Sequence, residues 1–254
     1  DYEIAPAELD KVLGSALWQG VSVVGLNGGE PTLRRDLAEI AEVLQCRLPR
    51  LGQISLITNA LVPTKVIARI DELVEVVRRH GTTLDVMISL DGIGAVHDTV
   101  RGRPRNFAKA AAVLNHVLAI GPSVTVRLGC TVVRDNVYGM HDLHEFAVER
   151  GVYIKYRLGV PHQRLYNEAF PEPFALKLEE RLHFAEFLRH VAARYEPSER
   201  QKFFYKSLIG QFLYGLPRTA GCDWQHRGAT LSSRGELLYC AVKSPVLGSA
   251  ITED

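Results

Sequence analysis

Small polar and charged residues gather at four points of this 254-residue sequence, each directly after a short apolar run. The four points are residues 27–32 (NGGEPT), 58–60 (TNA), 89–92 (SLDG) and 131–136 (TVVRDN). A glycine pair lets the backbone approach a ligand closely, and the Glu30 carboxylate is an acceptor for a cationic group. The simpler interpretation is that the glycines only make a strand-to-helix turn and that Thr32 only caps the helix.

These residues need a scaffold that brings the ends of the apolar runs together. The runs rich in β-branched residues predict strands at Val21–Leu26, Gln53–Ile57, Leu84–Leu90, Val124–Val133 and Val152–Leu158. Helical periodicity predicts helices at Pro6–Gln19, Leu33–Leu48, Pro63–His80, Phe107–Ile120 and Met140–Arg150. Apolar strands that alternate with helices indicate a parallel sheet of right-handed βαβ units, either doubly wound or part of a (β/α) barrel. Ligands bind at the carboxyl ends of such strands.

The pattern changes after residue 158. Residues 159–173 predict a loop, and Ala175–Tyr195 and Ser198–Tyr214 predict two long helices. A small hairpin is expected from Ala229–Ser232 and Glu236–Cys240, which flank a turn at residues 233–235. We therefore expect one domain at 1–195 and a linker helix with a small cysteine-containing segment at 196–254.

Composition excludes several classes of protein. The chain is 46% hydrophobic and 23% charged, which is typical of globular proteins and excludes disordered, collagen-like and disulfide-rich chains. With 30 basic and 29 acidic residues, no net charge favours nucleic acid or a membrane surface. No apolar run reaches the roughly 20 residues of a transmembrane helix, and no signal peptide is recognisable. Four scattered cysteines favour a reducing, cytoplasmic setting.

The series of motifs resembles the radical S-adenosylmethionine (radical SAM) superfamily. The resemblance rests on GGEP after a strand, then TNA, then SLDG followed by His97-Asp98 and Arg101-Gly102, then a strand leading to Asn136. It covers about residues 5–245 and points to the branch with a SPASM or twitch auxiliary-cluster domain. It implies an α/β fold, a partial (β/α)6 TIM-like barrel that lacks its first strand. A small C-terminal subdomain with a cysteine-containing hairpin would follow.

The resemblance also implies roles for individual residues. Gly28, Gly29 and Glu30, with Pro31 stiffening the turn, would hold the amino group of SAM. Ser89 and Arg101 would bind its methionine carboxylate. The residues expected beside the ribose or the adenine, or supporting the pocket, are Thr58, Asn59, Asp91, Val132 and Asn136.

The sequence departs from the family in one respect. It has no CxxxCxxC loop, the motif that binds the 4Fe–4S cluster, because its four cysteines lie too far apart. By the resemblance, the strand missing from the predicted set is the first, which carries that loop in the family. We therefore expect the chain to be an excerpt, truncated at both ends, with the cluster ligands outside it; alone it would not cleave SAM reductively. The alternative is a degenerate homologue that has lost the chemistry.

The cysteines that remain have other expected roles. Cys222, Gly235 and Cys240 match the CX9–15GX4C signature of a SPASM or twitch domain, so both cysteines are candidate ligands of an auxiliary iron–sulfur cluster. The alternative is a chance pair of small apolar residues. Cys130 lies within a strand and is either a core residue or, less expected, a hydrogen-atom donor to a substrate radical. Cys46 is expected to be a packing residue.

The resemblance implies an enzyme that cleaves SAM to a 5′-deoxyadenosyl radical and abstracts a hydrogen atom from a substrate. We expect a ribosomally made peptide, with a small molecule such as an aminocyclitol as the alternative. An electron donor such as flavodoxin or ferredoxin would be a partner. Two alternatives are a non-catalytic SAM- or peptide-binding homologue and an unrelated nucleotide-binding α/β enzyme. Tyr156, Arg157 and His162 stand where a substrate could bind, but the sequence assigns them no role.

Overall fold

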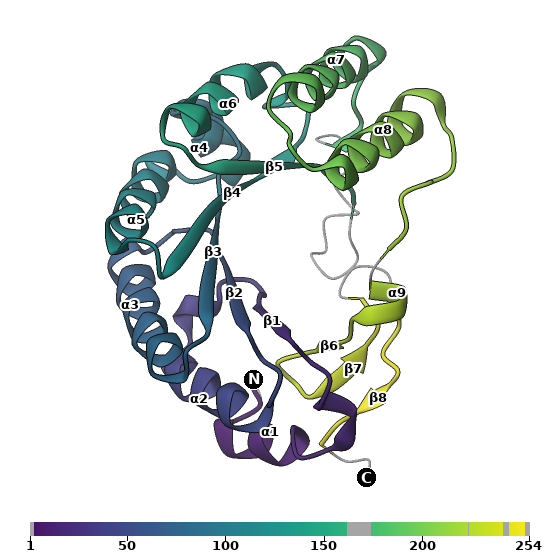
Figure 1. Cartoon of the computed structure of the whole chain (residues 1–254). Coiled ribbons are helices and arrows are strands. Elements are labelled where there is room, and N and C mark those ends of the chain that lie inside the picture. Colours follow the sequence, from purple (N-terminus) through teal and green to yellow (C-terminus); the bar gives the residue numbers. More distant parts are fainter. Residues whose placement is uncertain (1–2, 162–173, 223, 241–243, 252–254) are drawn as a thin grey trace.

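Five parallel strands form one strongly curved sheet in this computed structural model, which describes residues 3–161, 174–222, 224–240 and 244–251. The strand order follows the chain, β1-β2-β3-β4-β5, and every neighbouring pair is parallel. The strands are β1 (Val23–Leu26), β2 (Gln53–Thr58), β3 (Thr83–Ser89), β4 (Val124–Val132) and β5 (Tyr153–Leu158). Figure 1 shows helices along the outer side of this crescent. The expectation of a partial (β/α) barrel is confirmed.

The helices follow the strands in alternation. They are α1 (Pro6–Val12), α2 (Leu37–Arg47), α3 (Pro63–His80), α4 (Ala95–Arg101), α5 (Asn106–Ile120) and α6 (Met140–Glu149). Helix α3 shows how the sequence sets such an element: Pro63 stands at its first turn, and Gly81 ends it in the left-handed conformation at φ 67°. Its fully buried residues, such as Ile70 and Leu73, face the sheet.

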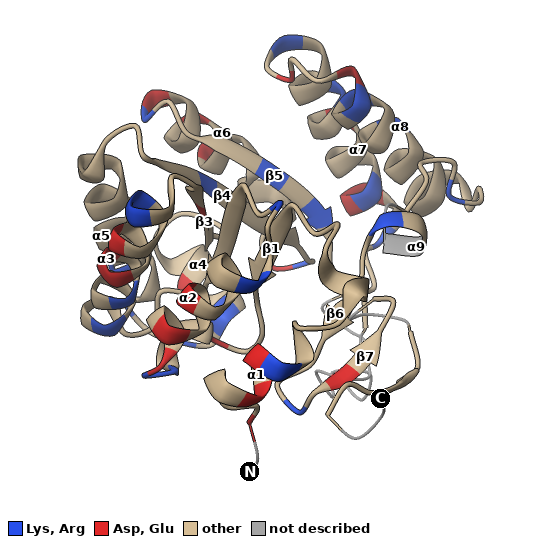
Figure 2. Ribbon diagram, turned by 60° about the horizontal axis from the view of Figure 1, so that its bottom comes forward, with Lys and Arg blue, Asp and Glu red and all other residues tan. Residues whose placement is uncertain are grey.

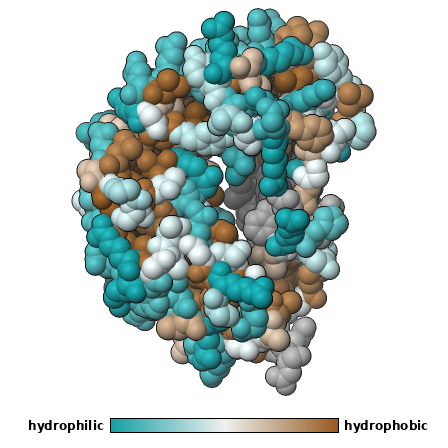
Figure 3. Space-filling view, in the orientation of Figure 1, coloured by the Kyte–Doolittle hydropathy of each residue, from teal (hydrophilic) through white to brown (hydrophobic). Residues whose placement is uncertain are grey.

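The two faces of the sheet differ in character. In β2, Ile54 and Leu56 are completely buried under the helices, whereas Ser55 between them points to the inside of the crescent. The space-filling view shows a hollow at the centre of the molecule in the orientation of Figure 1 (Figure 3). The barrel is therefore apolar on its outer, helix-covered side and carries polar side chains toward the hollow.

Three local predictions differ from the structure. The first helix ends at Val12, near Gly14, and a 3-10 turn at Ala16–Trp18 follows. The second helix begins later than predicted because Pro31–Leu33 forms a separate 3-10 turn. Helix α4 was not predicted, since its seven residues are too few to show a clear helical period.

The C-terminal part packs back on the barrel. Helices α7 (Leu178–Arg194) and α8 (Glu199–Tyr214) are followed by the short α9 (Trp224–Arg227) and an antiparallel sheet of β6 (Thr230–Leu231), β7 (Glu236–Leu238) and β8 (Gly248–Ser249). The predicted hairpin is confirmed, and β8 is an added third strand.

The small sheet lies beside β1 and α1, on the far side of the central hollow from β4 (Figure 1). The amide of Ile4 donates a hydrogen bond of 2.6 Å to the carbonyl of Ser233, which joins the first residues of the chain to the hairpin turn. The division at residue 195 stays a prediction. No helix within the described ranges is long and apolar enough to cross a membrane.

Candidate functional site

The glycine pair after β1 has free space in front of it. Gly28 adopts φ 148°, a conformation that side-chain-bearing residues rarely take, so glycine is needed there for the backbone itself. A Cβ atom built on Gly28 or on Gly29 would meet no other atom within 4 Å. The loop thus presents bare backbone to an open region, where a ligand can approach it.

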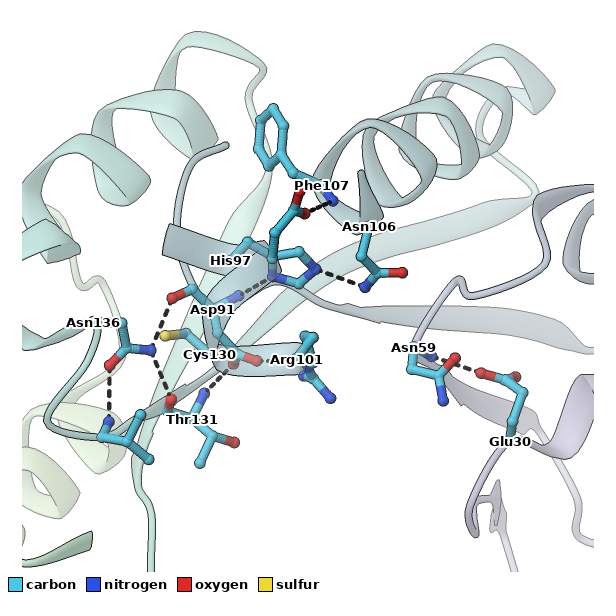
Figure 4. Close-up of polar contacts among 12 residues, drawn as sticks. Glu30, Asn59, Asp91, His97, Arg101, Asn106, Phe107, Cys130, Thr131 and Asn136 are labelled. Atoms are coloured by element: carbon cyan, nitrogen blue, oxygen red, sulfur yellow. Dashed lines mark hydrogen bonds and ion pairs between the residues drawn. The ribbon is translucent and has the colours of Figure 1, made fainter. Parts of the chain in front are cut away.

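Glu30 is held firmly at the end of this loop (Figure 4). Its carboxylate accepts hydrogen bonds from the hydroxyl of Thr32 at 2.7 Å, from the hydroxyl of Thr58 at 3.0 Å and from the amide of Asn59 at 2.7 Å. Within the described residues Glu30 forms no ion pair. A half-buried carboxylate that is oriented by neutral donors and has no cation is suited to a cationic ligand group such as an ammonium.

The end of β2 locks the same loop from the other side. The Asn59 side-chain amide donates to the carbonyl of Gly29 at 3.3 Å, and its oxygen accepts from the amide of Leu61 at 3.1 Å. The Thr58 hydroxyl also accepts from the amide of Ala60 at 3.1 Å. The predicted neighbours Gly29, Glu30, Thr58 and Asn59 are therefore brought together by the parallel pairing of β1 with β2.

Asp91 is the centre of a second group, at the end of β3, and its residue is only 1% exposed. One carboxylate oxygen accepts from the amide of Thr131 at 2.8 Å, and the other lies 2.5 Å from Nε of Arg101. The Asp91 carbonyl accepts from the side chain of Asn136 at 2.8 Å. Asp91 thereby connects β3 with α4, with β4 and with the turn after β4, as Figure 4 shows.

His97 supports Asp91 from helix α4 and is completely buried. Its Nδ1 accepts a hydrogen bond of 2.9 Å from the amide of Asp91, and its Nε2 lies 2.9 Å from the side-chain amide of Asn106. Burial lowers the pKa of His97, against the opposing effect of the Asp91 charge, so the ring is favoured in its neutral form. A neutral ring that accepts at Nδ1 carries its proton at Nε2, so the Asn106 amide must turn its oxygen, which otherwise lacks a described partner, toward that proton.

Arg101 and Ser89 offer the donors that remain in this region. The guanidinium of Arg101 is held through Nε by Asp91, and its side chain keeps 28% of its surface exposed. No described residue hydrogen-bonds to its outer nitrogens or to the hydroxyl of Ser89, the last residue of β3. Figure 4 shows Arg101 between the residues around Asp91 and the pair Asn59 and Glu30. A fixed guanidinium with unused N–H groups is suited to a carboxylate.

The other predicted site residues have structural positions. Pro31 begins the 3-10 turn after Glu30. Val132 is buried on the helix side of β4, and the side chain of Asn136 is buried and fully used, because it also accepts from the amide of Val133 at 2.8 Å. Cys130 is buried with its sulfur 3.6 Å from the sulfur of Met140 in α6, and burial raises the pKa of its thiol. That position favours packing over hydrogen donation.

The remaining cysteines do not form a metal site within the described part of the chain, where no group of three or more His, Cys, Asp or Glu residues is arranged to hold an ion. Cys222 precedes α9 and Cys240 follows β7, and both are partly exposed. Their role as cluster ligands stays a prediction. Cys46 is exposed on α2, so the expectation that it packs in the interior is wrong. His162 lies outside the described residues.

Sequence reasoning missed two supporting residues. Asn106 is completely buried beside His97, although nothing in the sequence distinguishes it from an ordinary residue at the start of a helix. Thr32 was assigned only a capping role, whereas its hydroxyl orients Glu30. The Glu30–Thr32 spacing within a strand-to-helix turn was the available signal, because a side chain often bonds to the residue two positions ahead there.

Comparisons with known proteins indicate the family of this chain. The family model described as Radical SAM superfamily matches residues 1–146. The chain is 26% identical to the PqqA peptide cyclase of Methylorubrum extorquens (strain PA1) over 249 residues, covering 95% of this chain and 60% of that protein. It is 31% identical to Molybdenum cofactor biosynthesis protein 1 of Drosophila melanogaster over 139 residues, covering 54% of this chain and 23% of the relative.

The fold is also found among solved structures. Native anSMEcpe with bound AdoMet and Cp18Cys peptide superposes with a TM-score of 0.68 at 16% identity, covering 99% of this chain and 71% of that one. Nearly all of this chain therefore superposes on part of a longer solved chain. The chain also spans 60% of the length of the Methylorubrum extorquens peptide cyclase. On the family match, which extends over more than half of its residues, the chain belongs to the radical SAM superfamily.

Proposed function

We propose that this chain carries the SAM-binding site of a radical SAM enzyme that abstracts a hydrogen atom from a peptide. The observation that carries the proposal is the Glu30 carboxylate. It is oriented by Thr32, Thr58 and Asn59, has no cationic partner among the described residues, and lies next to open glycine backbone. The α-ammonium group of SAM supplies the missing positive charge.

The methionine part of SAM binds between the two groups of residues. Its ammonium donates to the Glu30 carboxylate and to the carbonyls of the glycine pair. Its carboxylate accepts from the outer nitrogens of Arg101, whose Nε is fixed by Asp91, and from the hydroxyl of Ser89. Opposite charges at the two ends of the amino acid thus meet complementary protein groups, which orients the ligand.

The other predicted residues act through these contacts. Thr58 and Asp91 already use their side-chain atoms for Glu30 and for Arg101 and Thr131, so they position the pocket. Asn59 keeps a half-exposed side chain that would lie near the ribose of SAM, while Val132 and Asn136 set the end of β4, beside which the adenine would pack. These residues exclude water from the reacting part of the ligand and hold it in one orientation.

The chain contains candidate ligands for an auxiliary iron–sulfur cluster but none for the cluster that binds SAM. The four cysteines cannot form a CxxxCxxC site, so no residue of this chain is assigned to the SAM cluster. Cys222 precedes α9 and Cys240 follows β7, both are partly exposed, and we assign them to an auxiliary cluster as two of its ligands. When SAM and a reduced 4Fe–4S cluster are bound, they supply the 5′-deoxyadenosyl radical that takes the hydrogen atom.

A peptide substrate is supported by the relatives rather than by the SAM site. The curated relatives that match most of this chain carry the name PqqA peptide cyclase, and the matching solved structure contains a peptide. Barrel motifs that bind SAM are independent of the substrate, so they do not separate a peptide from a small molecule. Flavodoxin or ferredoxin is the proposed electron donor, because cleavage of SAM consumes one electron.

The test is the formation of 5′-deoxyadenosine by the native protein, reconstituted anaerobically with iron and sulfide and treated with SAM and dithionite. We expect slow product formation without substrate, and less of it with Glu30→Gln than with Glu145→Gln, an exposed glutamate with no partner in the described structure. Absence of any cluster in the native protein would contradict the enzyme and leave a SAM- or peptide-binding homologue.

A further inference from the structure

The inner face of β4 and β5 carries a group of cations that the SAM site does not use. Along β5, Ile154 and Tyr156 are buried on the helix side, so Lys155 and Arg157 point to the hollow of the barrel. Arg127 faces the same way from β4. Figure 2 shows the corresponding blue segments on β5. We refer to Arg127, Lys155 and Arg157 as the lumen cations.

The carboxylates near the lumen cations already have partners. Asp85 on β3 is only 1% exposed and accepts from Nε of Arg127 at 2.8 Å. Glu196, between α7 and α8, accepts from the hydroxyl of Tyr153 at 2.8 Å and from the amide of Ser198 at 3.0 Å. Lys155 and Arg157 form no ion pair with any described residue. Among the residues that the structure describes, two positive charges on this wall therefore lack an ion-pair partner.

The surroundings of Lys155 make this imbalance costly. Burial lowers the pKa of Lys155, and the neighbouring charges of Arg157, Arg127 and Arg200 lower it further, while Glu196 opposes them. Burial and Arg127 also lower the pKa of Arg157. Arg157 nevertheless keeps an exposed surface, as expected of a side chain that lines a hollow. The Lys155 ammonium lies 6.0 Å from the ring centroid of Phe204 in α8, a neutral contact that does not supply a counter-charge. An anion in this hollow would relieve the repulsion without displacing an ion-pair partner among the described residues.

Strand register places Lys155 level with the SAM site. Ser89 lies opposite Gly129, and Gly129 lies opposite Lys155, so the three residues form one row across β3, β4 and β5. With strands about 4.8 Å apart, the outer two residues of the row are about 10 Å apart. Gly129 puts no side chain between them, and a Cβ atom there would come within 2.9 Å of the sulfur of Met87. The side chain of Met87 therefore covers the middle of this row, and the two end residues flank it on the inner wall.

We propose that Lys155 and Arg157 bind a carboxylate group of the peptide substrate inside the barrel, beside the SAM site. This inference rests on the proposed function and adds the chemical class of group that the substrate presents. Two cations on one face of one strand, about 7 Å apart, can hold the two oxygens of one carboxylate, and the planar guanidinium matches that geometry. The carboxylate would belong to an acidic side chain or to the chain terminus.

The experiment measures binding of capped peptides to the unreduced native protein, with SAM present, by NMR titration at low ionic strength. Three probes separate the sources: acetyl-Gly-Glu-Gly-amide, acetyl-Gly-Gln-Gly with a free carboxylate, and neutral acetyl-Gly-Gln-Gly-amide. The variants are Lys155→Met, Lys155→Arg and Arg157→Gln. Lys65→Met is the matched control, because Lys65 is exposed on α3 and has no partner in the described structure.

We expect at least one charged probe to bind about tenfold more tightly than the neutral probe. Lys155→Met and Arg157→Gln should each abolish most of that difference, Lys155→Arg should restore part of it, and Lys65→Met should leave it unchanged. Preference for the glutamate probe assigns an acidic side chain, and preference for the free terminus assigns the chain end. Equal binding of all three probes, or charge-dependent binding that survives both substitutions, overturns the inference.

A thermal melt of each variant identifies those that fail to fold, and Arg157→Gln keeps the test valid if Lys155→Met is one of them. Because binding is measured without reductant, it does not depend on SAM cleavage. A protein that makes 5′-deoxyadenosine but shows no charge-dependent binding refutes only this inference. A protein that binds the charged probe but makes no 5′-deoxyadenosine contradicts the proposed function instead.

Discussion

The hydroxyl of Thr58 lies 3.0 Å from each of the two carboxylate oxygens of Glu30, although 28 residues separate them in the chain. Parallel register explains the meeting, because Leu26 at the end of β1 pairs with Leu56, two residues before Thr58. The loop of one strand is thus oriented by the terminal hydroxyl of the next. This contact fixes the orientation of the Glu30 carboxylate, and substitutions at either residue can test its role.

Glu30→Gln is expected to weaken the binding of SAM about tenfold or more, since the charge-assisted bond to the ammonium becomes a neutral one. Isothermal titration of the native protein with SAM measures the change. Glu145→Gln, on the exposed side of α6, serves as the control and should bind SAM normally. Equal affinity in the two variants would show that the ammonium is bound elsewhere.

Thr58→Val should reduce both stability and SAM affinity. The substitution keeps the size of the side chain but removes the donor to Glu30 and the acceptor for the buried amide of Ala60. Leaving buried polar groups unpaired lowers the free energy of unfolding by about 1–3 kcal/mol. Urea denaturation gives the value, and Thr58→Ser should recover most of the loss. A variant with wild-type stability would argue against this network.

Gly29→Ala distinguishes binding from folding. A methyl group at this position meets no atom within 4 Å in the structure, and the backbone of Gly29 is not in the left-handed region. The melting temperature should therefore stay unchanged, while SAM affinity falls because the methyl group occupies the ligand's space. Gly28→Ala should lower stability as well, by about 1–3 kcal/mol, because of its backbone conformation. Unchanged SAM affinity in Gly29→Ala would place the ligand away from this loop.

His97 should make the stability of the protein depend on pH. Its pKa in the folded protein lies below the ordinary value of 6.5, chiefly through burial. As the pH falls below about 6.5, the unfolded chain therefore takes up the proton first, and the free energy of unfolding decreases. His144 and His183 also have lowered pKa values and act in the same direction. The contribution of His97 is therefore obtained as the difference between the wild type and a variant that lacks this histidine.

The measurement is urea denaturation of the wild type and of His97→Gln at several pH values between 5 and 8. The substitution should reduce stability at neutral pH, since the bonds to Asp91 and Asn106 change, and it should flatten the loss of stability on acidification. An identical dependence on pH in the two proteins would mean that His97 stays neutral in the unfolded chain too, or is charged in the fold.

The sequence predicted the barrel because its signals are local. Apolar strands such as Gln53–Thr58 and Thr83–Ser89 are bounded by turn residues, and the helices between them show a clear period. The residues that we propose for SAM binding could be singled out because their motifs lie directly at the strand ends. Residues that support them from a distance were not found. Asn106 contacts His97 across nine positions and two helices, and no local pattern encodes that pairing.

The lumen cations show a second limit of sequence reasoning. The alternation of β5 indicates which of its residues share a face. It does not indicate that the carboxylate of Asp85, on β3, already pairs with Arg127 on β4. The balance of charge in the hollow depends on which side chains meet across strands. That information appears only once the register of β3, β4 and β5 is known.

The most direct test of the SAM site is a crystal structure of the native protein with SAM bound. We predict that the amino nitrogen lies within hydrogen-bond distance, about 3 Å, of the Glu30 carboxylate, with the methionine carboxylate on Arg101. The same structure would place the ligand over the backbone of Gly28 and Gly29. A SAM molecule bound with its amino group away from Glu30, or in another part of the barrel, would contradict the assignment of this site.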